Sequence, residues 1–262
     1  MDNNYLERES APIGPETWKL LNTVMIEAAK SQLAGRRIID IDGPFGFGLK
    51  VIPLTDCELE EGISGSTFVP VNLIKSGFSL GKRDLASFER DKLTLDTTCV
   101  AAAAIDCAAR EDRMIFQGTQ GIAGLLTVDG TSSLTLTKWD KVGTAADQVI
   151  EAVTKLDDAG FHGPYCMALA PAQYNLLLRR YPQGDGTELD HIRGIVSEGV
   201  VKAPALKKGG VILASGRQYV SLAIGLDMSI GYNGPVGDDL EFYVAESLAL
   251  MVRVPGAVCV LK

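Results

Sequence analysis

Apolar residues recur with a helical period in four stretches of the chain and form β-type patterns in most of the rest. In the first stretch, Pro15 opens a helix at no cost in hydrogen bonds, and Trp18, Leu21 and Met25 then share one face. We expect Gly35 to stop this helix in a left-handed conformation. The chain therefore starts with an amphipathic helix that buries one side.

The other three helical stretches lie in the middle of the chain. One begins at a capping Asp96 or Thr97 and runs to about Gln117. The second spans residues 144–159 and starts with the Thr-x-x-Asp spacing of a capping box. The third, residues 171–180, follows the apolar run PYCMALA, which is typical of a buried strand. Helix, strand and helix in this order predict a compact α/β subdomain.

Strand patterns occupy the remaining regions. Ile39 and Ile41 alternate with aspartates, which is the period of a half-exposed strand. Residues 48–92 are short β-leaning pieces with no apolar core of their own, so we expect them to lie on something else. From Val200 onward the pattern predicts strands only.

Composition and charge narrow the class of protein. The 262 residues are 46% apolar, which is enough to fill a sizeable core, and we expect a folded, soluble protein. With 33 acidic and 25 basic side chains, the average field repels a phosphate backbone, so we expect no nucleic-acid partner. The longest apolar runs are too short to cross a membrane. The 5 cysteines include no C-x-x-C pair and indicate reduced thiols in a cytoplasmic protein.

Residue types that carry catalysis are sparse. His162 and His191 are the 2 histidines, each at a polar turn or loop, and no G-x-S-x-G motif accompanies them. Adjacent acids such as Asp238 and Asp239 lack metal-ligand spacing. The glycine-rich GPFGFG after residue 42 matches neither G-x-G-x-x-G nor a P-loop. We therefore predict no catalytic residue, no metal site and no cofactor.

A series of short motifs nevertheless has a recognisable order. SAPIGPETW, QLAGRRIIDIDGPFGFG, FERDKLTLD, MIFQG, GIAGLL, GFHGPY and DMSIGY follow one another between about Leu6 and Leu261. This order resembles the family 1 encapsulins, bacterial and archaeal nanocompartment shell proteins once described as linocin-type bacteriocins. The resemblance implies an α+β fold, that of the tailed-bacteriophage major capsid proteins, with a peripheral domain, an axial domain and an extended β loop.

The resemblance also implies boundaries for these parts. Residues 1–50 would hold a lumen-facing helix and the start of the peripheral domain, 51–92 the extended loop, 93–135 the spine helix of the peripheral domain, 136–225 the axial domain with a pore loop at 181–190, and 226–262 the C-terminal strands of the peripheral domain.

Function follows from the same resemblance. The chain would assemble with copies of itself into an icosahedral shell, most simply on the smallest lattice, and would have no catalysis of its own. The shell would lie in the cytoplasm and enclose a cargo protein, such as a ferritin-like protein or a dye-decolourising peroxidase, through a C-terminal targeting peptide of that cargo. This sequence does not identify the cargo, because the targeting peptide belongs to a different protein.

The peptide-binding residues expected from the resemblance lie near the end of the first helix and in a late strand. Arg36 and Asp40 would pair with polar groups of the peptide, and Ile39 would help to form its apolar groove. Ile230 and Tyr232 would form the second half of this peptide-binding groove. The alternatives are that Arg36 and Asp40 bridge each other or neighbours, and that the late pair is ordinary sheet packing.

The pore loop would carry an acidic, metal-free opening. Asp185 and Glu188, repeated around a fivefold axis, would favour the entry of small cations. Some relatives carry an aromatic residue where this chain has Arg83, so the flavin association seen in the family is not expected here. The pore residues implied are Gly184, Asp185, Gly186, Thr187 and Glu188.

Two other classes of protein remain as alternatives. A phage or prophage major capsid protein that packages DNA would share the fold, but a basic inner arm and a longer chain would be typical of it. A hydrolase or flavoprotein is the third reading, and the missing catalytic constellation counts against it.

Overall fold

The computed structural model describes residues 4–262, which divide into two compact units. The first unit comprises Met1–Gln32, of which residues 1–3 lie outside the description, together with Asp42–Arg110 and Ala223–Ala249. The second comprises Leu33–Ile41, Glu111–Leu222 and Leu250–Lys262. Each unit thus draws on three separate parts of the chain.

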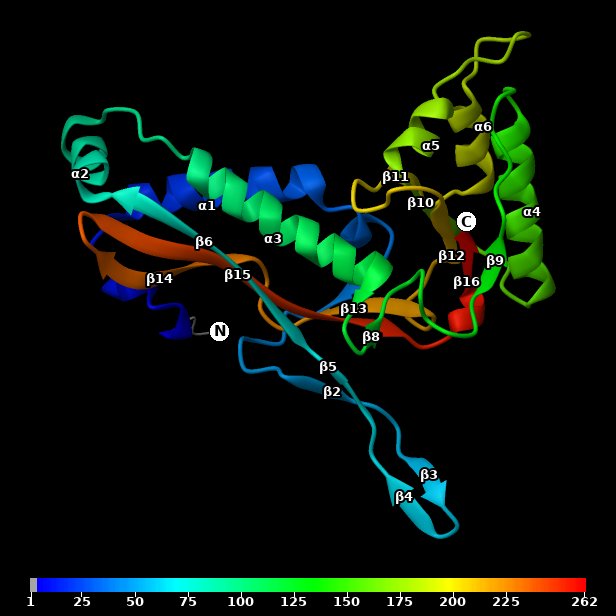
Figure 1. Cartoon of the computed structure of the whole chain (residues 1–262), viewed down its shortest axis with the longest axis horizontal. Coiled ribbons are helices and arrows are strands. Elements are labelled where there is room, and N and C mark those ends of the chain that lie inside the picture. Colours follow the sequence, from blue (N-terminus) through cyan, green and yellow to red (C-terminus); the bar gives the residue numbers. More distant parts are fainter. Residues whose placement is uncertain (1–3) are drawn as a thin grey trace. The chain divides into compact units, whose positions relative to one another are not determined.

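The first unit is organised around a sheet and two helices. After the short turns η1 (Asn4–Leu6) and η2 (Arg8–Ser10), helix α1 spans Pro15–Gln32, as the sequence predicts. The sheet has the order β1-β13-β15-β14, and β6 also pairs with β15. Figure 1 shows α1 and the start of α3 on one side of the long strands. The strands are β1 (Asp40–Asp42), β6 (Asn72–Gly81), β13 (Val220–Ile224), β14 (Ser229–Val236) and β15 (Asp239–Val252). By the bounds given above, residues 40–41 of β1, 220–222 of β13 and 250–252 of β15 count with the second unit.

Helix α3 (Thr98–Gln117) begins where the sequence predicts, because Asp96 Oδ1 accepts a hydrogen bond from the Thr98 amide at 2.9 Å. Hydrogen bonds from the side chain and then the amide of Thr98 lower the pKa of Asp96. Small buried residues such as Ala104 and Ala108 let neighbouring elements approach this helix closely.

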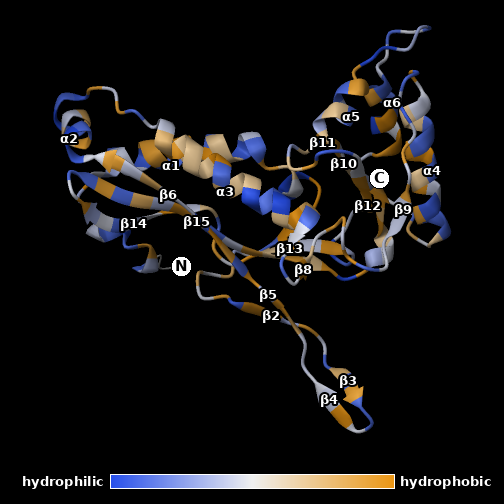
Figure 2. Ribbon diagram, viewed as in Figure 1, coloured by the Kyte–Doolittle hydropathy of each residue, from blue (hydrophilic) through white to orange (hydrophobic). Residues whose placement is uncertain are grey.

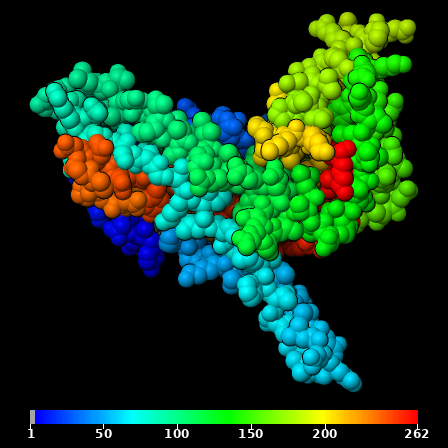
Figure 3. Space-filling view, viewed as in Figure 1, coloured from blue at the N-terminus to red at the C-terminus, as the bar shows by residue number. Residues whose placement is uncertain are grey.

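The segment predicted to be one extended loop divides into three different structures. Two short ladders form a hairpin, which we call the arm: β2 (Val51–Pro53) pairs with β5 (Phe68–Pro70), and β3 (Cys57–Glu60) pairs with β4 (Ile63–Gly65). Figures 1 and 3 show the arm extending away from the sheet of its unit.

The rest of that segment belongs to the body of the first unit, which corrects the expectation. β6 pairs with ten consecutive residues of β15, and residues 82–91 form helix α2 (Lys82–Asp91) rather than β structure. Glu89 of α2 accepts hydrogen bonds from the Gly14 amide and the Thr17 hydroxyl at the start of α1. The helix has a strongly polar outer face, which hides its single buried apolar residue, Leu85, from a periodicity search.

The second unit contains a five-stranded sheet in the order β11-β10-β12-β16-β9, with α4 and α6 packed together beside it (Figure 1). Its core is a continuous apolar cluster that includes Trp139, Leu156, Met167 and Ile212. Its strands are β9 (Ser132–Leu134), β10 (Tyr165–Leu169), β11 (Val200–Lys202), β12 (Gly210–Ala214) and β16 (Val258–Leu261), and its helices are α4 (Thr144–Asp158), α5 (Pro171–Leu176) and α6 (Glu188–Ile195). The short elements are η3 (Gly35–Arg37), β7 (Gly118–Thr119), β8 (Ile122–Ala123) and η4 (Pro255–Ala257).

Three further expectations need correction. The last strand, β16, pairs with β12 and β9 of the second unit instead of joining the first sheet, since all four of its residues are buried there. Helix α5 ends at Leu176, short of Arg180. Gly35 does not stop α1 in a left-handed conformation: it lies in η3, and its missing side chain makes room for Ile115, whose Cδ1 would be 2.6 Å from an added Cβ.

Candidate functional site

A hollow of about 650 Å³ lies along α1 in the first unit, and we call it the α1 hollow. On its other face α1 buries Thr17, Leu21, Met25 and Ala29, so the helical period separates a packed side from an open side. The hollow is lined by Arg8, Glu9, Ala11, Ile13, Pro15, Trp18, Lys19, Asn22, Thr23 and Ile26.

A cation and an aromatic ring meet in this hollow. The guanidinium carbon of Arg8 lies 4.1 Å from the centroid of the Trp18 ring, and Nη2 of Arg8 donates to Asn22 Oδ1 at 3.4 Å. Burial lowers the pKa of Arg8, but an arginine so placed still carries its charge at neutral pH. The arrangement holds a positive charge against an apolar surface, with part of its hydration removed.

Apolar groups extend this surface along the helix and before it. Ile26 is 44% exposed on the open face of α1, and Tyr5 is 72% exposed and stacks on Phe47 with ring centroids 5.8 Å apart. Leu6 fixes this N-terminal segment because it is fully buried in a small cluster with Leu226, Tyr243 and Ala245. The α1 hollow can therefore hold an apolar peptide side chain next to an acidic group.

The two late residues of the predicted groove are buried in the sheet of the first unit. Ile230 is fully buried and Tyr232 is 7% exposed in β14, so both belong to the packing of the sheet. Tyr232 contacts Phe242, and Phe242 in turn packs edge-on against Trp18. Tyr232 therefore supports Trp18 of the α1 hollow from inside the sheet, through Phe242.

Arg36 has a structural partner within the second unit. Its Nε and Nη2 donate to both carboxylate oxygens of Glu111 at 2.8 to 3.0 Å, and Glu111 is fully buried. A buried carboxylate needs such a bidentate cation, since an uncompensated charge would be very costly. The alternative of a bridge to a neighbour is therefore the arrangement found for Arg36.

The residues around Arg36 are anchored in the same way. Asp112 accepts hydrogen bonds from the amides of Ala34 and Gly35 at 2.9 to 3.1 Å, and burial raises its pKa to about 6. Ile39 is 5% exposed, whereas Asp40 is exposed at the start of β1. Of the predicted recognition residues in this segment, only Asp40 presents an open side chain in the described chain.

The predicted pore loop is exposed at its tip. Gly184, Asp185 and Gly186 are all exposed. Thr187 caps α6 in a reciprocal capping box with Asp190, and those hydrogen bonds lower the pKa of Asp190.

Glu188 is not an exposed loop acid, which corrects the expectation for this residue. Its side chain is fully buried, and Oε1 accepts hydrogen bonds from the amides of Gly143, Ala145 and Ala146 at 2.9 to 3.1 Å. It thus caps the N-terminus of α4, a role that the sequence analysis assigned to Thr144. Arg179 lies 3.5 Å from its other oxygen.

Each of the two histidines contacts one polar partner in the described residues. His162 contacts Asp157 at 3.2 Å, and His191 contacts the hydroxyl of Tyr181 at 2.8 Å. Residues 4–262 contain no group of three His, Cys, Asp or Glu placed to hold a metal. In the same range no helix is long and apolar enough to cross a membrane.

Arg8, Trp18 and Ile26 were not predicted from the sequence to be surface groups of one hollow. A weak signal existed, since Ile26 departs from the buried face of α1 defined by Leu21 and Met25. The position of Arg8 over the helix depends on the anchoring of Leu6, which the local sequence does not reveal.

Comparisons with known proteins agree on one family. The Linocin_M18 family, described as an encapsulating protein for peroxidase, matches residues 3–249. The type 1 encapsulin shell protein EncA of Myxococcus xanthus is 31% identical over 280 residues, which cover 99% of this chain and 96% of that protein.

Solved structures agree on the fold. The virus-like particle of Pyrococcus furiosus aligns with a TM-score of 0.78 at 20% identity, covering 94% of this chain and all of that one. The capsid of Myoviridae phage XM1 aligns at 0.56 and 12% identity, over 85% and 88% of the two chains. The fold is the α+β fold of phage capsid proteins, and the sequence matches show that this chain belongs to the Linocin_M18 family of encapsulating proteins.

Proposed function

We propose that this chain is a structural shell protein that assembles with copies of itself into a closed icosahedral compartment in the cytoplasm and encloses a cargo enzyme. The observation that best supports assembly is the exposed, apolar arm, in a chain that belongs to a family of encapsulating proteins. The family description and the name of the Myxococcus relative, an encapsulin shell protein, support the enclosing role. Catalysis is left to the cargo.

The arm exposes apolar side chains, and their exposure adds no stability to a single chain in water. Leu59, Ile63 and Phe68 are 54 to 62% exposed, and Figure 2 shows hydrophobic positions along the hairpin. Two-stranded ladders are marginal on their own in water, so a neighbouring copy would both cover and stabilise the arm. A contact of arm on body is heterologous, and such contacts close into shells when the geometry repeats.

The α1 hollow is the surface we assign to the cargo. A C-terminal peptide could place an apolar side chain against Trp18 and Ile26, while Arg8 pairs with an acidic side chain or the terminal carboxylate. The family description names a peroxidase, so a peroxidase-class enzyme is the first cargo to test. Asp40 is the remaining candidate from the predicted set.

The pore proposal narrows to the exposed tip of the loop. Asp185 is exposed between two glycines, so copies gathered around a fivefold axis would create a negative ring that favours small cations. Glu188 contributes to the shape of this loop by holding α4, and not to the charge of an opening.

Assembly is tested by removing the apolar surface of the arm. The double variant Leu59→Ser/Phe68→Ser should fold but fail to form shells in negative-stain electron microscopy. The matched control is Val236→Ser, since Val236 is 55% exposed in the same unit but lies outside the arm. Normal shells from the double variant would remove the arm from the assembly mechanism.

Cargo capture is tested with two isoleucines of almost equal exposure. Ile26→Glu should lower the amount of peroxidase co-purifying with intact shells at least tenfold, because a buried charge replaces an apolar contact. Ile150→Glu is the control, since Ile150 is 45% exposed on α4. Equal cargo retention in both variants would contradict the assignment of the α1 hollow.

The likeness of the fold to a phage capsid supports one rival function, the packaging of DNA. The net charge of −8 disfavours it, because a polyanion would meet an average negative field. Purified particles with an absorbance ratio typical of protein alone would exclude this rival, and nuclease-protected DNA inside them would favour it.

A further inference from the structure

A second hollow lies in the second unit, at the end of its sheet where three strands finish. It has a volume of about 540 Å³ and is lined by Leu136, Thr137, Lys138, Trp139, Asp140, Gln173, Leu176, Arg179, Lys208, Gly209 and Lys262. β10 and β16 both run antiparallel to β12, and β9 runs parallel to β16. The hollow is therefore formed by segments that follow β9, β10 and β16 and precede β12. We call it the strand-end hollow.

The backbone of this hollow is held in place from behind. The amide oxygen of Gln148 accepts hydrogen bonds from the Thr137 amide at 3.0 Å and from Trp139 Nε1 at 2.8 Å, which fixes the segment that carries Lys138. The carbonyl of Lys262 accepts from the Leu136 amide at 2.7 Å. Preorganised walls of this kind reduce the entropy cost of binding.

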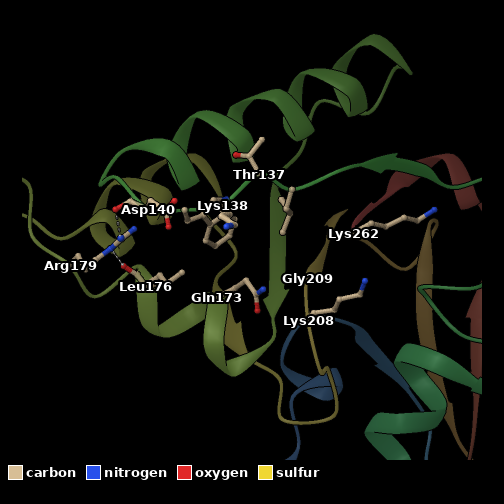
Figure 4. Close-up of a pocket in the computed structure, with 11 residues that line it drawn as sticks. Thr137, Lys138, Asp140, Gln173, Leu176, Arg179, Lys208, Gly209 and Lys262 are labelled. Carbon is tan, nitrogen blue, oxygen red and sulfur yellow. Dashed lines mark hydrogen bonds between the residues drawn. The ribbon is translucent and has the colours of Figure 1, made fainter.

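The other two sides are anchored as well. The carbonyl of Gly209 accepts from the Ala170 amide at 2.9 Å, which ties the segment of Lys208 to the end of β10. The Arg179 side chain donates to the carbonyls of Leu176 at 2.9 Å and Asp140 at 3.2 Å. In Figure 4, Lys208, which precedes β12, and Lys262, which follows β16, lie on one side of Gln173, with Asp140 and Arg179 on the other side.

The charge of the strand-end hollow opposes that of the whole protein. Arg179 lies 3.5 Å from buried Glu188, and the other charged side chains that line the hollow are Lys138, Lys208, Lys262 and one acid, Asp140. Within residues 4–262 none of these three lysines forms a salt bridge. In a chain of net charge −8, several lysines gathered at one hollow repel one another unless an anion joins them.

The neutral groups of the hollow suit the same kind of ligand. Gln173 has a buried amide oxygen without a hydrogen-bond partner in the described residues, and a rotation of the amide by half a turn would present two N–H donors there. Leu136 and Leu176 add apolar walls. The volume falls in the range of ordinary small-molecule sites and exceeds what a single inorganic phosphate fills.

We propose that the strand-end hollow binds a small, multiply charged oxyanion, a compact phosphate or polycarboxylate compound, through Lys138, Lys208 and Lys262. On this proposal the flexible lysine side chains turn toward the anion when it binds, and the Gln173 amide donates to it. This site is separate from the α1 hollow and does not depend on cargo capture.

The test uses inorganic pyrophosphate and citrate as probes, titrated into the purified full-length protein by isothermal calorimetry at low ionic strength. We expect saturable binding that Lys138→Gln/Lys208→Gln weakens at least tenfold. The matched control is Lys207→Gln, since Lys207 is exposed next to Lys208 but does not line the hollow. The control should change the affinity less than twofold.

The outcomes separate this proposal from its rivals. Absence of binding by both probes, or equal weakening by the control variant, overturns it. Binding by the non-assembling arm variant together with no binding by intact shells would also overturn it, because a second copy would then occupy the hollow. Tighter binding of pyrophosphate than of citrate would assign a phosphate compound, and the reverse a polycarboxylate. Shell formation and cargo content should stay normal in the lysine variants, so failure here leaves the shell function intact.

Discussion

The arm and strand β6 are neighbours in sequence with the same β-leaning composition, yet they have opposite surroundings. Phe68 in the arm is 61% exposed, whereas Phe78 in β6 is 8% exposed and stacks on Phe242 with centroids 5.5 Å apart. β6 is paired with β15 along its whole length, and the arm pairs only with itself. The difference shows that strand propensity indicates what a segment can form, but not whether its partner lies in the same chain.

Three other pairs of like residues, close together in the sequence, also differ in burial. Arg36 is bound to Glu111 while Arg37 is exposed, and Glu188 is buried while Asp185 is exposed. In α3, Asp112 is buried, whereas Asp106 is half-buried and pairs with Arg110. Each pair offers a matched comparison. The stability measurements below use the arm variant Leu59→Ser/Ile63→Ser, which keeps Phe68 and should not assemble, so that shell formation does not add to stability.

The two phenylalanines give the largest expected difference. Phe78→Ala should lower the free energy of unfolding by about 3 to 5 kcal/mol, because a buried aromatic leaves a cavity. Phe68→Ala should change it by less than about 0.5 kcal/mol, because its ring is exposed in the single chain. Urea unfolding measures both, and equal losses would mean that the arm folds back on its own unit in solution.

The two arginines give the next largest difference. Arg36→Ala leaves the buried carboxylate of Glu111 without its bidentate partner, which costs about 3 kcal/mol of stability. Arg37→Ala should cost less than about 0.5 kcal/mol. A stable Arg36→Ala variant that has lost its cargo would restore Arg36 as a recognition residue, so cargo retention is scored beside the unfolding curve.

The two acids of the predicted pore loop give the third expected difference. Glu188→Ala removes the acceptor for three amides at the start of α4 and should cost about 2 to 3 kcal/mol. Asp185→Ala should leave stability unchanged and slow the entry of small cations into shells. An unchanged cation entry rate in Asp185→Ala would remove the acidic ring from the proposed function.

The smallest effect is a pH dependence from Asp112. Burial raises its pKa from an ordinary 3.8 to about 6, so the folded state binds the proton more tightly than the unfolded state does. The contribution of Asp112 to the free energy of unfolding is therefore greatest below pH 4. It falls by about 2 kcal/mol as the pH rises from 4 to 6. Subtracting the stability curve of Asp112→Asn from that of the parent should reveal this decline, whereas a flat difference would mean that the carboxylate stays charged.

Sequence patterns located most of the elements but not the site residues. The start of α1 at Pro15 and of α3 after Asp96 were confirmed, because a proline or a capping aspartate acts within three residues along the chain. The peptide-binding residues implied by the resemblance stay a prediction, and the resemblance did not point to the exposed groups of the α1 hollow. Tyr232 contacts Phe242, which in turn packs against Trp18. Polarity alone could not distinguish an acid that binds a ligand from one that caps a helix.

What the sequence determined by itself is therefore the family, the α+β fold class, the helices with local start signals and the absence of a core in the arm. These properties depend on composition, on motif order or on contacts between near neighbours. Only the tertiary structure decided that Arg36 and Glu188 are internal partners, that β16 belongs to the second sheet and that lysines from three segments share one hollow. The physical reason is distance along the chain: Arg36 meets Glu111 across 75 positions and Glu188 meets Gly143 across 45, and burial at that separation follows from packing.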